Sequence, residues 1–193
     1  LGPRQCGKTT LAKRVAGQQP SSFYDMENPV DQRKLENPEL VFRDLSGLVV
    51  IDEIQAKPEL FPVLRVIVDQ ADNRCRFLIL GSASPFLVRR VSESLAGRVE
   101  FVDLSGFSLE EVGQEHWKSL WSRGGFPCSC LAETEENSVS WRDSFIRTFL
   151  QRDLPALDIR VSAMTLRKFW TMLAHYHGDV WNASRISSSL GVS

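Results

Sequence analysis

The residues from Gly2 to Thr9 fill the pattern Gly-x-x-x-x-Gly-Lys-[Ser/Thr]. Two glycines at this spacing let the backbone curl until successive N–H groups point inward, and a helix that follows adds the positive end of its dipole. Lys8 is then placed to reach the β- and γ-phosphates of a nucleotide, and Thr9 can offer its hydroxyl to a magnesium ion. The pattern predicts a phosphate-binding loop, and a plain Gly/Pro turn before a helix is the alternative interpretation.

A short apolar run further along the chain ends in two carboxylates. Leu48 to Ile51 contains only branched apolar residues, which is typical of a strand buried on both faces, and Asp52 and Glu53 follow directly. Because ligands bind at the carboxyl edge of a parallel sheet, we expect Asp52 to lie beside the phosphate loop. Asp52 suits contact with magnesium, directly or through water, and Glu53 suits orienting or deprotonating an attacking water. The alternative is a solvated acidic pair at a strand end.

A further predicted strand, residues 76–80, ends in the small polar run Gly81 to Pro85. In a sheet of this kind, a polar side chain at that strand end would lie between the carboxylate pair and the γ-phosphate and hold the water. Ser82 is the first candidate for this role and Ser84 the second. Ordinary turn and helix-cap chemistry would also explain both serines.

Several segments together resemble the prokaryotic AAA-type ATPases that carry a C-terminal domain of unknown function. The segments that carry this resemblance are residues 2–12, 48–55, 80–82, 94–98, 124–127 and 149–154. The resemblance implies binding of ATP with Mg²⁺, ATP hydrolysis, a five-stranded parallel core and a helical or winged-helix segment after it. Cys128 and Cys130 depart from the expected pattern after Pro127.

The motifs and the resemblance together name three groups of site residues. The residues expected to contact the nucleotide are Gly2, Gln5, Cys6, Gly7, Lys8, Thr9 and Thr10. Those expected at the metal are Thr9 and Asp52, and those expected to be catalytic are Glu53, Ser82 and Arg98. The role of Arg98 stays open between an arginine finger, acting within the chain or across a subunit interface, and a salt bridge with a carboxylate such as Glu93.

Strands that alternate with helices predict an α/β fold with right-handed crossovers and a parallel sheet. The expected fold class is a P-loop NTPase of the AAA type, with a parallel sheet flanked by helices, then an all-α segment leading into a winged-helix-like start. The expected domains are an ATPase core over 1–106, a helical segment over 107–178 and the start of a helix-turn-helix or C-terminal domain over 179–193. We expect this chain to be a fragment that lacks the buried strand feeding Gly2 and the remainder of the C-terminal region.

Hydrophobic periodicity, caps and breakers place the individual elements. Helices are predicted over 9–16, 28–35, 39–45, 58–70, 141–152 and 163–177, and strands over 22–25, 48–52, 76–80 and 99–102. Asn182 is the expected N-cap of a helix that ends at the turn residue Gly191, and the polar run 133–137 is expected to be a surface loop. The apolar stripes of the later helices are interpreted as core.

Composition limits the function classes. The chain has 193 residues, 23 basic against 24 acidic, so its overall charge gives no sign of binding to nucleic acid or to an anionic membrane. No apolar stretch approaches the roughly 20 residues that a membrane-spanning helix needs. The four cysteines form neither a disulfide framework nor a zinc-binding spacing, which indicates reduced thiols in a cytoplasmic protein.

Two functions from different classes fit these patterns. The first is a Mg²⁺-dependent ATPase whose hydrolysis changes the conformation of the C-terminal helices. The second is a nucleotide-gated regulator that binds DNA or protein with little turnover. Both require Lys8 and Asp52, whereas only the first requires Glu53 and Ser82. Besides ATP, the candidate partners are a second copy of the chain and a nucleic acid bound through the C-terminal helix-turn-helix.

Overall fold

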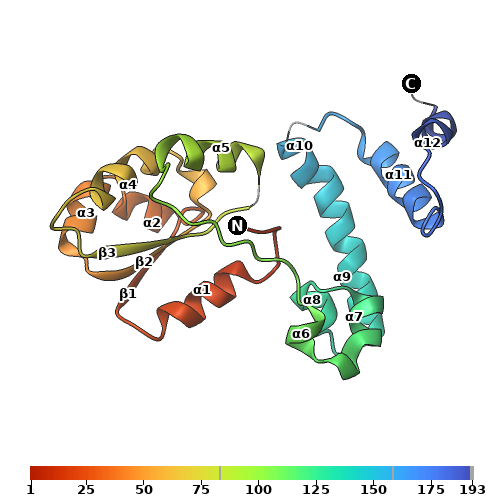
Figure 1. The fold of residues 1–193 in the computed structure, drawn as a ribbon, viewed down its shortest axis with the longest axis horizontal. Helices are drawn as coiled ribbons and strands as arrows, with labels where there is room; N and C mark the ends of the chain where they lie inside the picture. The colour runs from red at the N-terminus through yellow and green to blue at the C-terminus, as the bar shows by residue number, and fades with distance from the viewer. Residues whose placement is uncertain (83, 158, 192–193) are drawn as a thin grey trace. The chain divides into compact units, whose positions relative to one another are not determined.

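The computed structural model describes residues 1–82, 84–157 and 159–191. The chain forms two compact units, Leu1–Ser138 and Val139–Ser193. The first unit contains a parallel sheet with helices, and the described part of the second is helical (Figure 1). None of the helices in the described ranges is both long enough and apolar enough to span a lipid bilayer.

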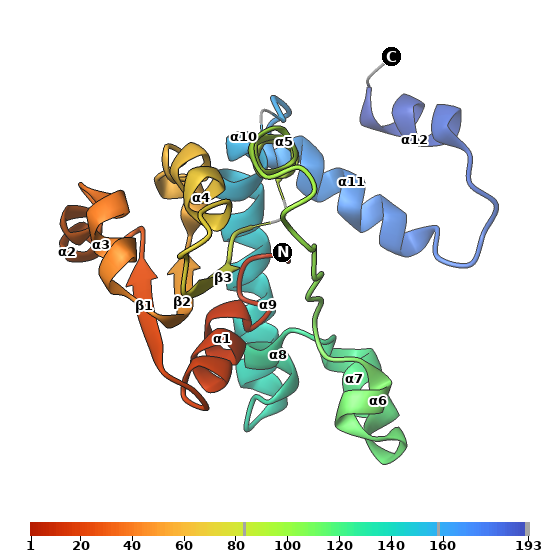
Figure 2. The same cartoon turned by 60° about the vertical axis from the view of Figure 1, so that its left-hand side comes forward.

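The sheet of the first unit has three parallel strands. They are β1 (Ser21–Asp25), β2 (Gly47–Asp52) and β3 (Cys75–Ile79), in the order β1-β2-β3, and all three run in the same direction in Figure 2. The register pairs Asp25 with Asp52, so the carboxyl ends of β1 and β2 meet at one edge. From Leu48 to Asp52 every residue of β2 is buried, because this strand has a neighbour on each side and helices over both faces. The predicted parallel α/β architecture is confirmed.

Five helices of the first unit cover the two faces of this sheet. They are α1 (Lys8–Ala16), α2 (Pro29–Lys34), α3 (Pro38–Asp44), α4 (Leu60–Val68) and α5 (Pro85–Ser94). Successive β2 side chains point to opposite faces. Val49 and Ile51 join the larger core under α3, α4 and α5, while Leu48 and Val50 pack with α1. Figure 1 shows α1 on one side of the strands and α2 to α5 on the other.

The strand predicted over 99–102 does not form. Residues 99–104 have no regular secondary structure. Two hydrogen bonds join this segment to Leu1: the Leu1 nitrogen donates to the Val102 oxygen at 2.6 Å, and the Leu104 N–H donates to the Leu1 oxygen at 2.7 Å. The next residue, Gly2, forms an isolated parallel bridge with Ser82, which follows β3. Two hydrogen bonds are too few to make a strand ladder. Within the described residues, three strands therefore stand in place of the implied five.

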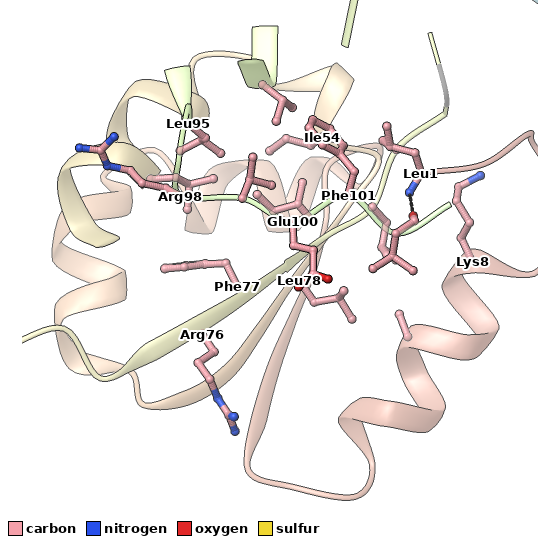
Figure 3. A pocket seen from close by; sticks show the side chains of 18 of the residues that line it. Leu1, Lys8, Ile54, Arg76, Phe77, Leu78, Leu95, Arg98, Glu100 and Phe101 are labelled. Carbon is pink, nitrogen blue, oxygen red and sulfur yellow. Dashed lines mark hydrogen bonds between the residues drawn. The ribbon is translucent and has the colours of Figure 1, made fainter. Parts of the chain in front are cut away.

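An apolar cavity of about 620 Å³ lies along β3, the last strand of the sheet (Figure 3). It is lined by Phe77 and Ile79 of β3, by Leu95 and by Phe101 and Val102 of the irregular segment. The expectation that a buried strand feeds Gly2 stays a prediction.

Asparagine side chains cap α2 and α12 (Ala183–Leu190), and the cap of α12, Asn182, is the predicted one. Asn28 caps α2 by accepting the Val30 N–H at 2.9 Å, and Asn182 caps α12 by accepting the Arg185 N–H at 3.1 Å. Gly191 follows α12 in the left-handed conformation with φ 68°. A short polar side chain at the cap satisfies an N–H group that has no partner inside the helix.

A short helix, η1 (Ile54–Ala56), directly follows β2. The later part of the first unit consists of further short helices: α6 (Leu109–Val112), η2 (Gln114–His116), α7 (Trp117–Arg123) and α8 (Pro127–Cys130). A buried pair of hydroxyls, on Ser129 and Ser138, joins α8 to the start of α9 (Glu135–Thr148) at 2.8 Å. The prediction of a loop over 133–137 was wrong for its second half, because the Thr134 hydroxyl accepts the Asn137 N–H at 3.1 Å and starts the helix at Glu135.

In the second unit, α9 continues through a π-helical turn, η3 (Phe149–Asp153), into α10 (Leu154–Ala156), and α11 (Ala163–His175) and α12 follow. Its aromatic stripe is a stack of rings whose successive centroids lie 5.1, 5.9 and 5.6 Å apart: Trp141, Phe145, Phe149 and Trp170. All four rings are half-buried, so the interpretation of the stripe as core stays a prediction. The winged-helix or helix-turn-helix start stays a prediction, and its last residues, 192–193, lie outside the described residues.

Replacing Asp31 with asparagine is expected to lower the free energy of unfolding at pH 7 by about 1 kcal/mol. Asp31 accepts hydrogen bonds from Lys34 Nζ at 2.8 Å and from the Asp25 N–H at 3.1 Å, and the Lys34 bond above all lowers its pKa. The folded protein therefore holds the Asp31 proton less tightly than the unfolded chain does. The stabilisation is complete above about pH 4 and is lost as the pH falls below it.

Urea unfolding of the Asp31→Asn variant and the parent at pH 7 and at pH 3 measures this effect. The difference in unfolding free energy between the two proteins should shrink at pH 3. A difference of the same size at both pH values would show that the ionised carboxylate is not its source.

Candidate functional site

The loop before α1 has the backbone conformation expected of a phosphate-binding loop. Gly7, the N-cap of α1, has a φ of 97°, which favours glycine, and it leaves the helix without a side-chain cap. A Cβ atom at Gly2 would collide with the backbone oxygen of Leu104. Both glycines of the motif are thus required by the local geometry. Because no side chain caps α1, its first N–H groups are available to an anion.

Lys8 lies inside this loop and is only 8% exposed. Its Nζ donates to the backbone oxygens of Gly2 at 3.0 Å and Pro3 at 2.7 Å. A buried ammonium group needs such acceptors, since burial of an unpaired charge is costly. The positive charge is therefore held in place by the loop itself.

Thr9 and Asp52 are in direct contact although 43 residues separate them. The Thr9 Oγ1 donates to Asp52 Oδ2 at 2.7 Å, and Asp52 Oδ1 accepts the Glu53 N–H at 3.0 Å. Asp52 is 3% exposed at the carboxyl end of β2, and Thr9 is in the first turn of α1. The sheet edge thus places the two expected metal-binding side chains together, next to the loop.

Glu53 follows in a strained backbone conformation. Its φ of 50° and ψ of 45° lie in the left-handed region, and its carboxylate accepts a hydrogen bond from Gln55 Nε2. Within the described ranges, Glu53 and Gln5, with φ 63°, are the two non-glycine residues with positive φ. Both belong to the expected site, and strained backbone of this kind is concentrated at functional positions.

The two candidate serines after β3 have different surroundings. The backbone of Ser82 bridges to Gly2, so Ser82 lies beside the phosphate loop. The Ser84 hydroxyl instead accepts the Leu87 N–H at 3.1 Å and caps α5. The helix-cap interpretation is therefore the one that the geometry of Ser84 supports, and Ser82 remains the candidate for holding a water.

Arg98 is engaged away from the phosphate loop. Its guanidinium forms a two-pronged pair with Asp69, at 2.6 and 2.8 Å, and donates to the Ala96 oxygen at 2.9 Å. The hydrogen bond between them raises the pKa of Arg98 and lowers that of Asp69. Figure 3 shows Arg98 and Lys8 at opposite ends of the cavity. This chain does not bring Arg98 to the phosphate loop, so an arginine finger across a subunit interface stays a prediction.

The remaining expected nucleotide contacts are less enclosed, except for Cys6. Gln5 and Thr10 are exposed, whereas Cys6 is 4% exposed and its thiol lies 3.6 Å from the Leu104 oxygen.

Cys6 and the other three cysteines are free thiols. Burial also raises the pKa of the Cys75 thiol. Cys128 is the exposed thiol of the four.

Two features of the site had no role assigned from the sequence. Pro127, at the start of α8, would lie 3.7 Å from a Cβ atom at Gly7, so α8 begins against the phosphate loop. The second feature is the bond between Gln55 and Glu53. Gln55 could have been found from the sequence, because it follows the carboxylate pair by two positions. Pro127 could not, because nothing in the sequence connects it to the distant loop at Gly7.

The donor set fits a magnesium ion better than a transition metal. No group of three His, Cys, Asp or Glu side chains with metal-binding geometry occurs in the part of the chain that the structure describes. One hydroxyl and one carboxylate, on Thr9 and Asp52, suit an ion that keeps several water ligands and shares phosphate oxygens.

Comparison with known proteins adds family membership. The profile of a family described as "AAA domain" matches residues 1–113, and that of a "Domain of unknown function (DUF8612)" matches residues 114–193. Two relatives, uncharacterized proteins of Mycobacterium tuberculosis and Mycobacterium bovis, are each 53% identical over 192 residues. The match covers 100% of this chain and 44% of each relative, so the chain spans less than half their length. The chain belongs to the AAA domain family and carries a C-terminal domain of unknown function.

Proposed function

We propose that this chain is a magnesium-dependent ATPase whose hydrolysis cycle changes the conformation of its C-terminal helices. The observation that carries the proposal is the 2.7 Å contact between the Thr9 hydroxyl and the Asp52 carboxylate, directly beside a glycine-bounded loop that encloses Lys8. A hydroxyl, a carboxylate, an ammonium group and uncapped helix N–H groups are the donors and acceptors that a metal-bound triphosphate requires.

Each group in the loop has a distinct task in this proposal. Lys8 exchanges its loop acceptors for phosphate oxygens, while Gly7 permits the backbone approach. Thr9 and Asp52 hold magnesium, which supplies charge neutralisation on the phosphate oxygens when it is bound. Gln5, Cys6 and Thr10 complete the nucleotide contacts. Glu53 orients or deprotonates the attacking water and Ser82 holds that water.

The wider biology of the protein is also a proposal, because the relatives extend well beyond this chain. We place the protein in the cytoplasm as a candidate homo-oligomer, in which Arg98 acts on a neighbouring copy. The capped α12 helix and the turn at Gly191 support a helix-turn-helix that contacts nucleic acid.

Replacing Lys8 with alanine is expected to weaken ATP binding by about 10- to 100-fold, since hydrogen bonds to charged groups contribute about 1.5–3 kcal/mol. Lys8 is the buried cation of the loop, so the variant leaves the phosphates without their ammonium partner. Titration calorimetry of the full-length protein with Mg-ATP measures the affinity. Lys13→Ala, on the exposed face of the same helix, is the matched control and should bind normally.

Equal affinity in the Lys8→Ala variant and the parent would contradict a nucleotide site in this loop. Loss of affinity in both lysine variants would instead point to a general effect of charge on α1. Phosphate release from the parent, measured in the same buffer with and without magnesium, establishes whether binding leads to hydrolysis.

A further inference from the structure

We propose that Gln55 is a positioning residue that orients the Glu53 carboxylate toward the attacking water. The inference rests on the proposed ATPase function and goes beyond it, since it concerns a side chain that touches neither phosphate nor metal. Its basis is the hydrogen bond from Gln55 Nε2 to Glu53 Oε2, together with the conformation of the turn that holds both residues.

The backbone around Glu53 is already held in place. The Ile54 N–H donates to the Leu80 oxygen at 3.2 Å, the Leu80 N–H donates to the Ile51 oxygen at 2.8 Å, and the Ala56 N–H closes the η1 turn on the Glu53 oxygen at 2.9 Å. These bonds tie both sides of Glu53 to the ends of β2 and β3. The remaining freedom of Glu53 lies in its side-chain torsions, and Gln55 is the side chain that restricts them.

The far end of Gln55 is consistent with an amide that is oriented by Glu53. An ionised carboxylate only accepts hydrogen bonds, so the amide must present its NH₂ group to Glu53 and turn its oxygen away. That oxygen, Gln55 Oε1, is buried without a hydrogen-bond partner among the described residues. It lies against Gly81, where an added Cβ atom would come within 2.9 Å of it.

An apolar side chain of the same length would avoid this unpartnered oxygen. Burial of a polar atom without a partner destabilises a fold, so packing alone gives no reason for glutamine at position 55. Orientation of Glu53 does give one. A base held by a third group is the usual arrangement for a side chain that must meet a water in a fixed direction, and here one carboxylate oxygen is held while the other is left for the water.

The test compares Gln55→Met and Gln55→Glu with the parent in the full-length protein. Methionine keeps the length of the side chain without the N–H donor, and glutamate keeps its shape but repels Glu53. We expect kcat to fall by about 10- to 100-fold in both variants, while KM for ATP stays within about twofold, because misorientation of a base affects the reaction step and not binding. The thermal midpoint of Gln55→Met should stay equal to that of the parent or rise. Gln70→Met, at an exposed glutamine, is the control and should change neither kcat nor KM.

A parallel rise of KM, or an unchanged kcat in both variants, would overturn the inference. A lower thermal midpoint together with lost activity in Gln55→Met would also overturn it, since that result describes a structural residue.

A second measurement is independent of turnover. The side-chain amide protons of Gln55 should resonate at an unusual downfield position in the NMR spectrum of the parent and return to the ordinary position in Glu53→Ala. An amide resonance that ignores Glu53 overturns the inference at any rate of hydrolysis. A responsive amide in a protein that binds Mg-ATP and never hydrolyses it upholds the contact and removes the ATPase proposal, so the two failures are distinguishable.

Discussion

The Glu53→Gln variant is expected to release phosphate from ATP about 100-fold more slowly than the parent, or slower still, with ATP affinity within about threefold of the parent value. Glutamine preserves the size of the side chain but neither accepts a proton nor attracts a water as a carboxylate does. The groups proposed to bind the nucleotide are unchanged, because Thr9 contacts Asp52 and Lys8 contacts the loop. The measurement is steady-state phosphate release together with equilibrium binding of Mg-ATP.

Glu59→Gln is a suitable control, since Glu59 is an exposed acid on the same segment that precedes α4. It should hydrolyse ATP like the parent. Bound ATP that persists without turnover in Glu53→Gln supports the ATPase. A slow rate that is the same in the parent and in Glu53→Gln favours the nucleotide-gated regulator and removes Glu53 from the mechanism.

The Phe61→Ala variant is expected to lose about 3–5 kcal/mol of unfolding free energy, the usual cost of removing a buried phenylalanine side chain. Phe61 is 1% exposed and lies in the larger core between α4 and the sheet. Alanine leaves a cavity there that the surrounding strands and helices cannot close without distortion. Equilibrium urea unfolding, followed by circular dichroism, measures the change.

Phe86→Ala provides the comparison, because the Phe86 ring is 55% exposed on α5, where it stacks with the Arg90 guanidinium. Its substitution should change the unfolding free energy by about 1 kcal/mol or less. Similar losses in both variants would mean that the core does not lie where the alternation of β2 side chains places it.

Local patterns predicted the centre of the fold and the placing of the candidate site. The apolar run ending at Asp52 is long enough to identify a buried strand by itself, and the glycine spacing before Thr9 is demanding enough to identify the loop. Each of these two signals is contained within a few consecutive residues of the chain. The rule that parallel strands end at a common edge then brought Thr9 and Asp52 together, and the structure has them in contact.

Features that depend on distant partners were not predictable in the same way. Arg98 pairs with Asp69 across 29 residues, and both side chains lie at element ends where periodicity says nothing about direction. The segment 99–104 has the composition of a strand, yet a strand forms only where a neighbour offers a ladder of matching length. The strained conformation of Glu53 was not predictable either, because glutamate carries no preference for positive φ.

That left-handed turn gives two adjacent acids separate duties. Asp52 faces the hydroxyl of α1, while one residue later Glu53 is turned toward the amide of η1. Under the proposed function, nucleotide binding and nucleotide hydrolysis therefore depend on different residues. One substitution at Glu53 would then yield a protein that still binds the nucleotide and no longer hydrolyses it.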